Sequence, residues 1–588
     1  MCSIIGIVSK ESVAPFLVES LRRMEYRGYD SVGIATLSRS SIKVKKGIGK
    51  VGQVSSNLDL PSMGGTVGIG HTRWATHGKV TDYNAHPHPC CTDDIAVVHN
   101  GIIENYSGLK SELLNRNHVF RSDTDTEVIS HLLEEAYSHS GDVKTAVLET
   151  VGRLQGTYAF VALFSTGTLA CARMDEPLVI GMSDNAFYAS SDVLGFLQHT
   201  DQAMFLENRD IAIIDGSGVQ VFDFGGRPVR REVTKVAWEL ADTNKGEFAH
   251  YTAKEIFEQR SSVVLATRQP AHTLASFCDI IGSAQKVIVT GSGTSYHSSV
   301  LISMLGSKLL KKRFEPIMAS EFQYDLDMLD SATAVIAISQ SGETADVLSA
   351  VKHARASGSK VVSIVNVPTS SLARIADASL AINCGPEIGV AATKSFTGQL
   401  SLAYAIIDRL SSGKVGFDAN ELALKFEGVL AHSYDIERIA ATQLSKASDI
   451  YLLGRSLHYP IALEGALKMK ELAYVHAEGI AAGELKHGPL AMMDRNACVI
   501  VINPQDRTYA DTLNSAHEVK ARGAKIIGIS NADSDIYDAL IRIPSVANDL
   551  LYPLIETIPL QLLSYYLALQ NNADPDFPRN LAKSVTVR

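Results

Sequence analysis

Hydrophobic and polar positions change their pattern near residue 240. Before it, short segments rich in β-branched and aromatic residues dominate. These segments predict strands at 3–8, 32–37, 66–71, 95–99 and 157–164. Amphipathic spacing predicts helices near 13–23 and 125–138. Because little here resembles a strand–helix–strand series, we expect a layered α+β domain over residues 1–240.

The second half alternates Val/Ile/Ala-rich strands with helices, which predicts parallel sheets covered by helices. Segment 286–293 is similar to 449–456, and 358–366 to 523–531, at offsets of 163 to 165 residues. The repeat predicts two similar α/β domains.

The remaining boundaries follow from these patterns. Polar turn residues predict a linker over 241–257, after which a helical stretch continues. The two repeat domains then occupy 258–430 and 431–570, and a tail occupies 571–588.

Composition restricts the class of protein. The chain has 588 residues, a net charge of −10 and a pI near 6.0, which argues against nucleic acid as a partner. Seven scattered cysteines without a CxxC pair indicate a reduced, cytoplasmic protein. No apolar run reaches the roughly 18 residues of a membrane span, and the N-terminus lacks a basic region, so we expect neither membrane insertion nor a signal peptide.

The first candidate nucleophile is Cys2. If Met1 is removed, Cys2 carries both a thiol and a free α-amine, whose pKa near 8 lets it accept the thiol proton. A buried structural cysteine ahead of a short strand is the alternative.

Three polar clusters follow Cys2 in the first half. Arg73 could clamp a carboxylate through its planar guanidinium. Asn100 and the N–H of Gly101 could form an oxyanion hole at a strand end. Thr124 and Glu127 have the spacing of a helix capping box. The histidines have no zinc-site spacing, so we expect no metal site among them: 71, 77, 86, 88 and 99.

Together these motifs resemble the N-terminal-nucleophile glutamine amidotransferase family over roughly residues 2–230. The motifs are MCxIxGI, YRGYDS, HTRWATHG, NAHPH, HNGIIEN and TDTEV. The resemblance implies an αββα sandwich in which Cys2 attacks the glutamine amide. It implies these further roles: oxyanion binding by Asn100 and Gly101, substrate binding by Arg73, Asp125, Thr76, His77 and His86, and an ammonia gate at Trp74. Ser3 replaces the family's usual glycine and could crowd the nucleophile.

Two loops in the first repeat domain have the chemistry of an anion site. Hydroxyls and backbone N–H groups gather at predicted helix starts in 291–295 and 339–344. The second repeat has Pro504, which lacks an N–H, and Asp506, which adds negative charge. We therefore expect phosphate binding in the first repeat, although helix capping alone would explain a single such loop.

The second repeat carries its own charged motif. Glu464, Lys468 and Glu471 share one stripe of a predicted helix whose other positions are mostly apolar. An exposed Glu–Lys ladder is the alternative, but this setting favours a pocket lining able to move protons. Lys583 stands five residues from the chain's end, and the preceding Pro578 to Leu581 hint that the tail docks.

The second half resembles the sugar isomerase domain pair of the glutamine–fructose-6-phosphate aminotransferase family. The motifs are GTSY, SQSGET, EIGVA-TK, ALEGALK-KE, AGELKHGPLA and PRNLAKSVTV. The resemblance implies phosphate binding by Thr294, Ser295, Ser339, Gln340, Ser341 and Thr344. It also implies proton transfer by Glu471, a Schiff base on Lys583, ring opening by His487 of a second subunit, and support from Lys468 and Glu464. Ala392 and Ser292 depart from the family's usual residues.

The whole resemblance implies an enzyme that makes glucosamine 6-phosphate and glutamate from glutamine and fructose 6-phosphate. It implies a homodimer and no cofactor. Three alternatives remain: a sugar-phosphate-sensing regulator, an amidotransferase acting on a phosphoribosyl donor, and an ammonia-dependent deaminase or isomerase with an inactive glutaminase.

Overall fold

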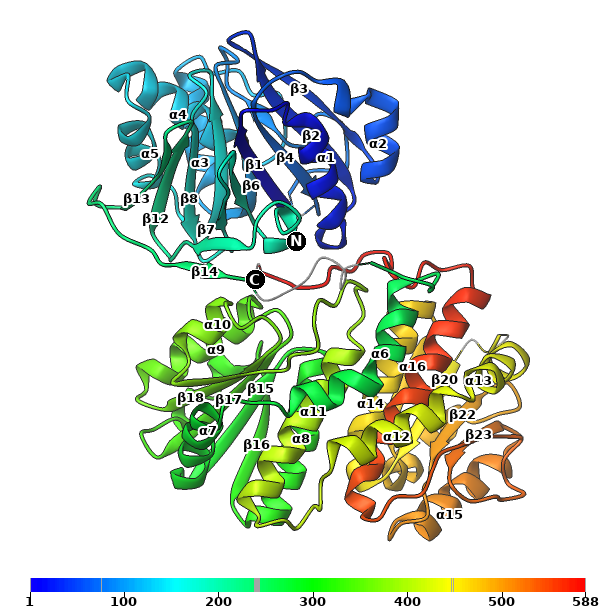
Figure 1. Ribbon diagram of the computed structural model, residues 1–588. Helices are drawn as coiled ribbons and strands as arrows, with labels where there is room; N and C mark the ends of the chain where they lie inside the picture. Colours follow the sequence, from blue (N-terminus) through cyan, green and yellow to red (C-terminus); the bar gives the residue numbers. More distant parts are fainter. Residues whose placement is uncertain (1, 76, 237–243, 446, 448, 587–588) are drawn as a thin grey trace. The chain divides into compact units, whose positions relative to one another are not determined.

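The computed structural model describes residues 2–75, 77–236, 244–445, 447 and 449–586 (Figure 1). The chain divides into two compact units. The first comprises Met1–Ala241 with Ser584–Arg588, and the second comprises Asp242–Lys583.

The first unit contains two antiparallel sheets. One has eight strands in the order β14-β11-β9-β10-β1-β4-β2-β3, and the other has six in the order β13-β12-β8-β7-β6-β5. The strands are β1 Ser3–Ser9, β2 Ser31–Ser38, β3 Ser41–Ile48, β4 Val67–Arg73, β5 His88–Pro89, β6 Ile95–Ile103, β7 Gly156–Phe164, β8 Leu169–Met174, β9 Val179–Met182, β10 Ala186–Ser190, β11 Gln202–Phe205, β12 Asp210–Asp215, β13 Gly218–Asp223 and β14 Val233–Lys235. The helices are α1 Ala14–Arg23, α2 Val51–Leu58, α3 Tyr106–Asn115, α4 Glu127–Ser140 and α5 Val143–Val151.

These elements form four layers. One apolar core, which includes Ile4 of β1 and Val161 of β7, lies between the two sheets. A second core packs Val128 and Leu132 of α4 against Val97 of β6. On the other side, α1 covers the eight-stranded sheet (Figure 1). The expected αββα sandwich is therefore confirmed.

The start of α4 differs from the sequence expectation. The helix begins at Glu127, and Thr124 does not cap it. Instead, the Glu127 carboxylate accepts hydrogen bonds from the backbone N–H groups of Arg121 and Ser122, at 2.7 Å each. The predicted capping box is wrong because Glu127 bonds to residues further back along the chain.

The second unit contains two parallel sheets with equivalent strand orders, β16-β15-β17-β18-β19 and β21-β20-β22-β23-β24. The strands are β15 Lys286–Gly291, β16 Arg313–Met318, β17 Thr333–Ser339, β18 Lys360–Val365, β19 Ala378–Ala381, β20 Asp449–Gly454, β21 His476–Ala481, β22 Cys498–Ile502, β23 Lys525–Ser530 and β24 Ala539–Arg542. The matched strand orders confirm the internal repeat read from the sequence.

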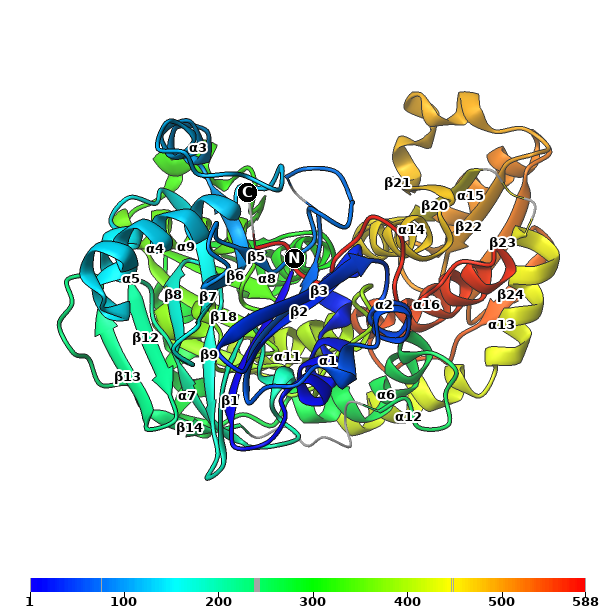
Figure 2. The ribbon, with the colours of Figure 1, turned by 90° about the horizontal axis from the view of Figure 1, so that it is seen from above.

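Some helices of both repeats pack together between the two sheets, and others cover the opposite face of each sheet. The helices are α6 Tyr251–Ala266, α7 Ala271–Ser283, α8 Thr294–Leu310, α9 Ala345–Ala356, α10 Ser371–Ile375, α11 Lys394–Leu410, α12 Ala419–Leu430, α13 Ser433–Ile439, α14 Tyr459–Ala473, α15 Tyr509–Lys520 and α16 Tyr552–Gln570. One continuous apolar core joins Val287 of β15 and Ile450 of β20 through Phe396, Ile461 and Ile558. Figure 2 shows α14 and α16 side by side.

Within the described ranges, no helix is long and apolar enough to cross a bilayer.

Candidate active sites

The strand ladder brings Cys2 to Trp74. Ser3 of β1 pairs with Thr72 of β4, so the residues just outside the ladder meet. The Trp74 backbone N–H donates to the Cys2 sulfur at 3.2 Å. Burial raises the pKa of the Cys2 thiol, and the Trp74 N–H and the Arg73 guanidinium offset only part of that rise. The thiol therefore needs a base at neutral pH, a role that a free α-amine on Cys2 could fill.

Asn100 points its amide at the nucleophile. Its Nδ2 donates to the Cys2 carbonyl oxygen at 3.1 Å. His71 Nε2 lies 3.2 Å from Asn100 Oδ1 and 3.0 Å from the His99 carbonyl. Burial lowers the pKa of His71 to about 3, so this ring is neutral and its Nε2–H faces two acceptors. That contact fixes the amide with its N–H side toward Cys2.

Gly101 continues the same strand with a backbone that requires glycine. Its φ is +112°, and a Cβ here would lie 2.0 Å from the Thr157 carbonyl oxygen. A side chain at this position would collide with β7, so only glycine fits beside Asn100.

A cation and an anion lie close to the nucleophile. The Arg73 guanidinium donates to the carbonyls of His77, Gly78 and Lys79, and it is close enough to Cys2 and Asp125 to interact with their charges. Asp125 is buried, and its Oδ2 accepts from the Ile103 N–H at 2.8 Å. Such a pair suits the carboxylate and amine of an amino acid.

Of the remaining predicted pocket residues, His77 is partly exposed and stacks edge-on against Tyr106, with ring centroids 5.7 Å apart. His86 is buried against His71, and its Nδ1 lies 3.3 Å from the His99 N–H. Since the other His86 nitrogen contacts Thr126 at 3.4 Å, this ring supports neighbouring residues. Thr76 lies outside the described residues.

Ser3, the residue beside the nucleophile, has a hydrogen-bond partner of its own. It is the first residue of β1 and fully buried. Its hydroxyl donates to the Met24 carbonyl at 2.8 Å. The departure from the family's glycine is therefore absorbed by a hydrogen bond on the strand.

In the second unit, two hydroxyl-rich loops share one sheet edge. β15 and β17 are parallel neighbours, so the loops after them lie together at the carboxyl ends of the strands. Thr294 and Ser295 open α8, and Ser339 Oγ lies 3.0 Å from Thr344 Oγ1 just before α9. Gln340 and Ser341 lie in the same loop, and both are partly exposed.

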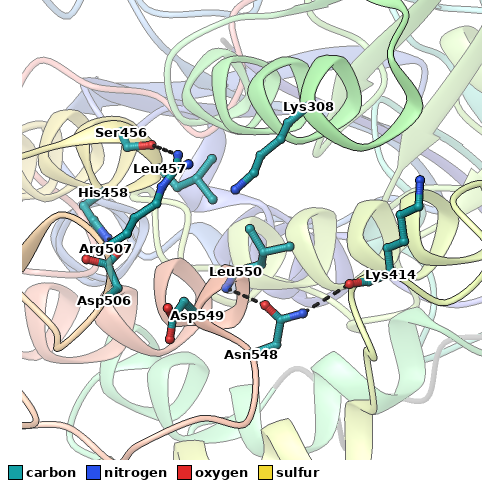
Figure 3. A pocket seen from close by; sticks show the side chains of 10 residues that line it. All are labelled: Lys308, Lys414, Ser456, Leu457, His458, Asp506, Arg507, Asn548, Asp549 and Leu550. Atoms are coloured by element: carbon teal, nitrogen blue, oxygen red, sulfur yellow. Dashed lines mark hydrogen bonds and ion pairs between the residues drawn. The ribbon is translucent and has the colours of Figure 1, made fainter.

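The equivalent place in the second repeat is already occupied by its own carboxylate. Asp506 accepts from the Thr508 N–H at 2.7 Å and lies 3.1 Å from His458 Nε2. The adjoining cavity of about 250 Å³ is lined by both basic and acidic side chains, with Ser456 and Arg507 hydrogen-bonded on one wall (Figure 3).

The charged stripe of α14 is buried rather than exposed. Glu464 and Lys468 are 2% and 1% exposed, and Lys468 pairs with both Glu464 (3.4 Å) and Glu471. Glu464 also bonds Thr294 Oγ1 at 3.0 Å and His297 at 2.7 Å. Burial opposes the charge on Lys468, but the Glu471 and Glu464 carboxylates outweigh it and raise the pKa of Lys468. The exposed-ladder alternative is thereby excluded.

The Lys583 side chain is buried and ion-paired in the second unit. Its ammonium lies 2.5 Å from Glu387 Oε2 and 2.8 Å from the Gly389 carbonyl. Glu387 also accepts from the Thr393 and Ser395 N–H groups at 2.9 and 3.0 Å. Burial alone would raise the pKa of Glu387, but Lys583 and these donors lower it to about 2.

Sequence reasoning gave no role to Glu387, although it lies in the EIGVA-TK motif. The carboxylate is close enough to act electrostatically on both Lys583 and Lys468, so it links the tail to the α14 stripe. The isolated acid between apolar residues was the available signal. His487 is exposed at the end of the 3₁₀ segment Ala482–His487.

Family models match both halves of the chain. A glutamine amidotransferase domain matches residues 71–198, and an SIS domain matches twice, at 280–409 and 443–570.

Relatives match along the full length. A glutamine–fructose-6-phosphate aminotransferase (isomerizing) of Methanothermobacter thermautotrophicus is 42% identical, and one of Pyrococcus horikoshii is 43% identical; each alignment covers all of both chains. A solved C-terminal domain of glucosamine-fructose-6-phosphate aminotransferase from Francisella tularensis is 31% identical, with a TM-score of 0.51, over 57% of this chain and 99% of that one. The chain therefore belongs to the glutamine–fructose-6-phosphate aminotransferase (isomerizing) family.

Proposed function

We infer that the chain converts glutamine and fructose 6-phosphate into glutamate and glucosamine 6-phosphate. The observation that carries this is the presence of two complementary sites on one chain. One has a thiol beside an oriented amide donor, and the other has a buried lysine linked to a Glu–Lys–Glu stripe. The first can release ammonia, and the second can use it.

In the glutaminase step, we propose that Cys2 attacks the side-chain amide of glutamine. The Asn100 amide and the Gly101 N–H would stabilise the developing oxyanion. Arg73 would bind the substrate carboxylate and Asp125 its amine, with Thr76, His77 and His86 around the pocket. Collapse of the tetrahedral intermediate releases ammonia and leaves a glutamyl thioester, which water hydrolyses to glutamate.

In the sugar step, the phosphate would bind the hydroxyls and N–H groups of Thr294, Ser295, Ser339, Gln340, Ser341 and Thr344. The Lys583 amine condenses with the open-chain ketone and water leaves. Ammonia then displaces the lysine to give a ketose imine. Glu471, paired with Lys468, moves a proton from C1 to C2 to give the amino aldose. Glu464 holds Lys468 from the other side.

We further propose that the chain works as a homodimer in which His487 assists ring opening in a second copy's sugar site. His487 is exposed, so its ring is accessible to a second copy of the chain. Trp74, whose backbone holds the nucleophile, is proposed to gate the ammonia that leaves Cys2. Ammonia that escaped into water at neutral pH would be protonated and unreactive.

A Cys2→Ala variant of the full chain tests this function. It should lose synthesis of glucosamine 6-phosphate from glutamine and keep synthesis from added ammonium at high pH. Survival of glutamine-driven synthesis would refute the role of Cys2.

A further inference from the structure

Four side chains in the first unit bring their ligand atoms together away from the proposed catalytic residues. They are Cys91, in the loop between β5 and β6, His118, which follows α3, and His131 and Glu134 on α4. All four ligand atoms lie within 4.8 Å of one another. Among the described residues, this is the group of His, Cys, Asp and Glu able to surround one ion.

The distances between these atoms are those of a tetrahedron around a metal. The Cys91 sulfur lies 3.6 Å from each Nδ1, and the two Nδ1 atoms lie 3.3 Å apart. Glu134 Oε2 lies 3.1 and 3.3 Å from His118 and His131 Nδ1. Zinc bond lengths predict tetrahedral edges of about 3.4 Å between nitrogens or oxygens and about 3.6 Å from nitrogen to sulfur.

Hydrogen bonding alone does not explain this packing. Each Nδ1 carries either one hydrogen or one lone pair, yet each has three close neighbours: the sulfur, the other Nδ1 and Glu134 Oε2. Each nitrogen can therefore form a hydrogen bond with at most one of these three neighbours. Lone pairs directed at one shared cation satisfy all of them together.

The surrounding contacts are those typical of metal ligands. The second ring nitrogen of His118, Nε2, lies within hydrogen-bond distance of Glu135 Oε1, at 3.3 Å, whereas His131 Nε2 makes only a longer contact of 3.8 Å with Glu127 Oε1. Carboxylates in this position orient a metal-bound imidazole. The Val119 backbone N–H donates to the Cys91 sulfur at 3.3 Å, as it would to a thiolate.

We propose that Cys91, His118, His131 and Glu134 bind one zinc ion in a structural site. Thiolate, two imidazoles and a carboxylate suit zinc, and four protein ligands leave no open position for substrate. The ion would join the β5–β6 loop to α4, the helix that follows Asp125. The sequence predicted no metal site among the clustered histidines 71, 77, 86, 88 and 99, whereas the proposed site uses residues spread over 91–134.

The first test measures zinc on the full chain. Protein stripped with a chelator is given one equivalent of Zn²⁺, desalted and analysed by mass spectrometry of its metal content. Wild type should retain one zinc per chain, as should His139→Ala, a matched control at an exposed histidine of α4. Cys91→Ala and His118→Ala should bind zinc roughly 100-fold or more weakly.

A second test on wild type does not depend on how the variants fold. Co²⁺ added to the stripped protein should give the intense visible bands of a tetrahedral site and a sulfur-to-cobalt charge-transfer band. Zn²⁺ should abolish these bands and raise the Tm of the stripped protein. The proposal is overturned if stripped wild type retains no zinc, or if Co²⁺ gives only weak octahedral bands without charge transfer.

Discussion

Replacing Asn100 with alanine should separate glutamine hydrolysis from sugar chemistry. The amide donates to the Cys2 carbonyl at 3.1 Å in the ground state, and it is held in that orientation by the neutral ring of His71. Loss of one oxyanion donor costs about 10²–10³ in kcat, or about 2.7–4 kcal/mol of transition-state stabilisation. The cost to folding should be about 1 kcal/mol, because His71 keeps the His99 carbonyl at 3.0 Å as an acceptor.

Two assays on one preparation measure this separation. Glutamate release from glutamine should fall by about 10²–10³, while ammonium-driven formation of glucosamine 6-phosphate should stay within about threefold of wild type. Asn105→Ala is a matched control. Asn105 makes two similar bonds, at 2.9 Å to the Arg153 carbonyl and 3.0 Å from the Gln155 N–H, but none to Cys2. Glutaminase activity should survive this substitution.

Either of two results would refute the assignment. Glutamate release reduced by less than about threefold in Asn100→Ala would show that the amide does not stabilise the transition state. An equal loss in Asn105→Ala would show that the effect is structural.

Three further predictions follow from individual contacts. Ser3→Gly should lower the free energy of unfolding by about 1 kcal/mol, measured with urea, because it loses the hydrogen bond to Met24. Its glutaminase kcat/KM, measured by glutamate release, should stay within about threefold of wild type, and a gain of tenfold or more would show that Ser3 crowds the thiol. Lys583→Arg keeps a cation near Glu387 but cannot form an imine, so synthesis from ammonium should fall by about 10³ or more; retained synthesis would exclude the Schiff base. Burial opposes the charge on His458, but the Glu556 and Asp506 carboxylates outweigh burial and raise the pKa of His458 to about 10. Because this pKa is higher in the folded than in the unfolded chain, protonated His458 stabilises the fold. That stabilisation is complete below about pH 6.5 and is lost as the pH rises through about 10. His458→Gln should therefore be less stable than wild type by on the order of 3 kcal/mol at pH 6, and the difference should shrink by pH 10; a gap in Tm that does not change with pH would contradict this.

The sequence correctly predicted those strands and helices in which nearly all side chains are buried, or in which buried and exposed side chains alternate with a regular period. β1 and β7 were placed within one residue at each end because their β-branched and aromatic residues are almost all buried. Helix α3 was missed because only Leu109 and Leu113 are buried on an otherwise polar segment, which gives little periodicity. Helix α2 was missed for a related reason, since it is short and contains Gly52.

Site residues were predictable where chemistry is concentrated in a short motif. Glu464, Lys468 and Glu471 could be grouped from helical spacing alone, and the structure shows them ion-paired and largely buried. Glu387 could not be given a role, because its partner Lys583 is 196 residues away in sequence. The orienting contact of His71 on Asn100 was likewise invisible, since it depends on how two strands approach.

The most direct test of the whole account is the yield of both products from one reaction. Wild-type protein with saturating glutamine and fructose 6-phosphate is sampled over time, and glutamate and glucosamine 6-phosphate are quantified together. If ammonia made at Cys2 is consumed at the Lys583 site, the two products should appear in a one-to-one ratio, and omission of the sugar should reduce glutamate release. Glutamate formed in large excess, or glucosamine 6-phosphate formed without glutamate, would contradict the account.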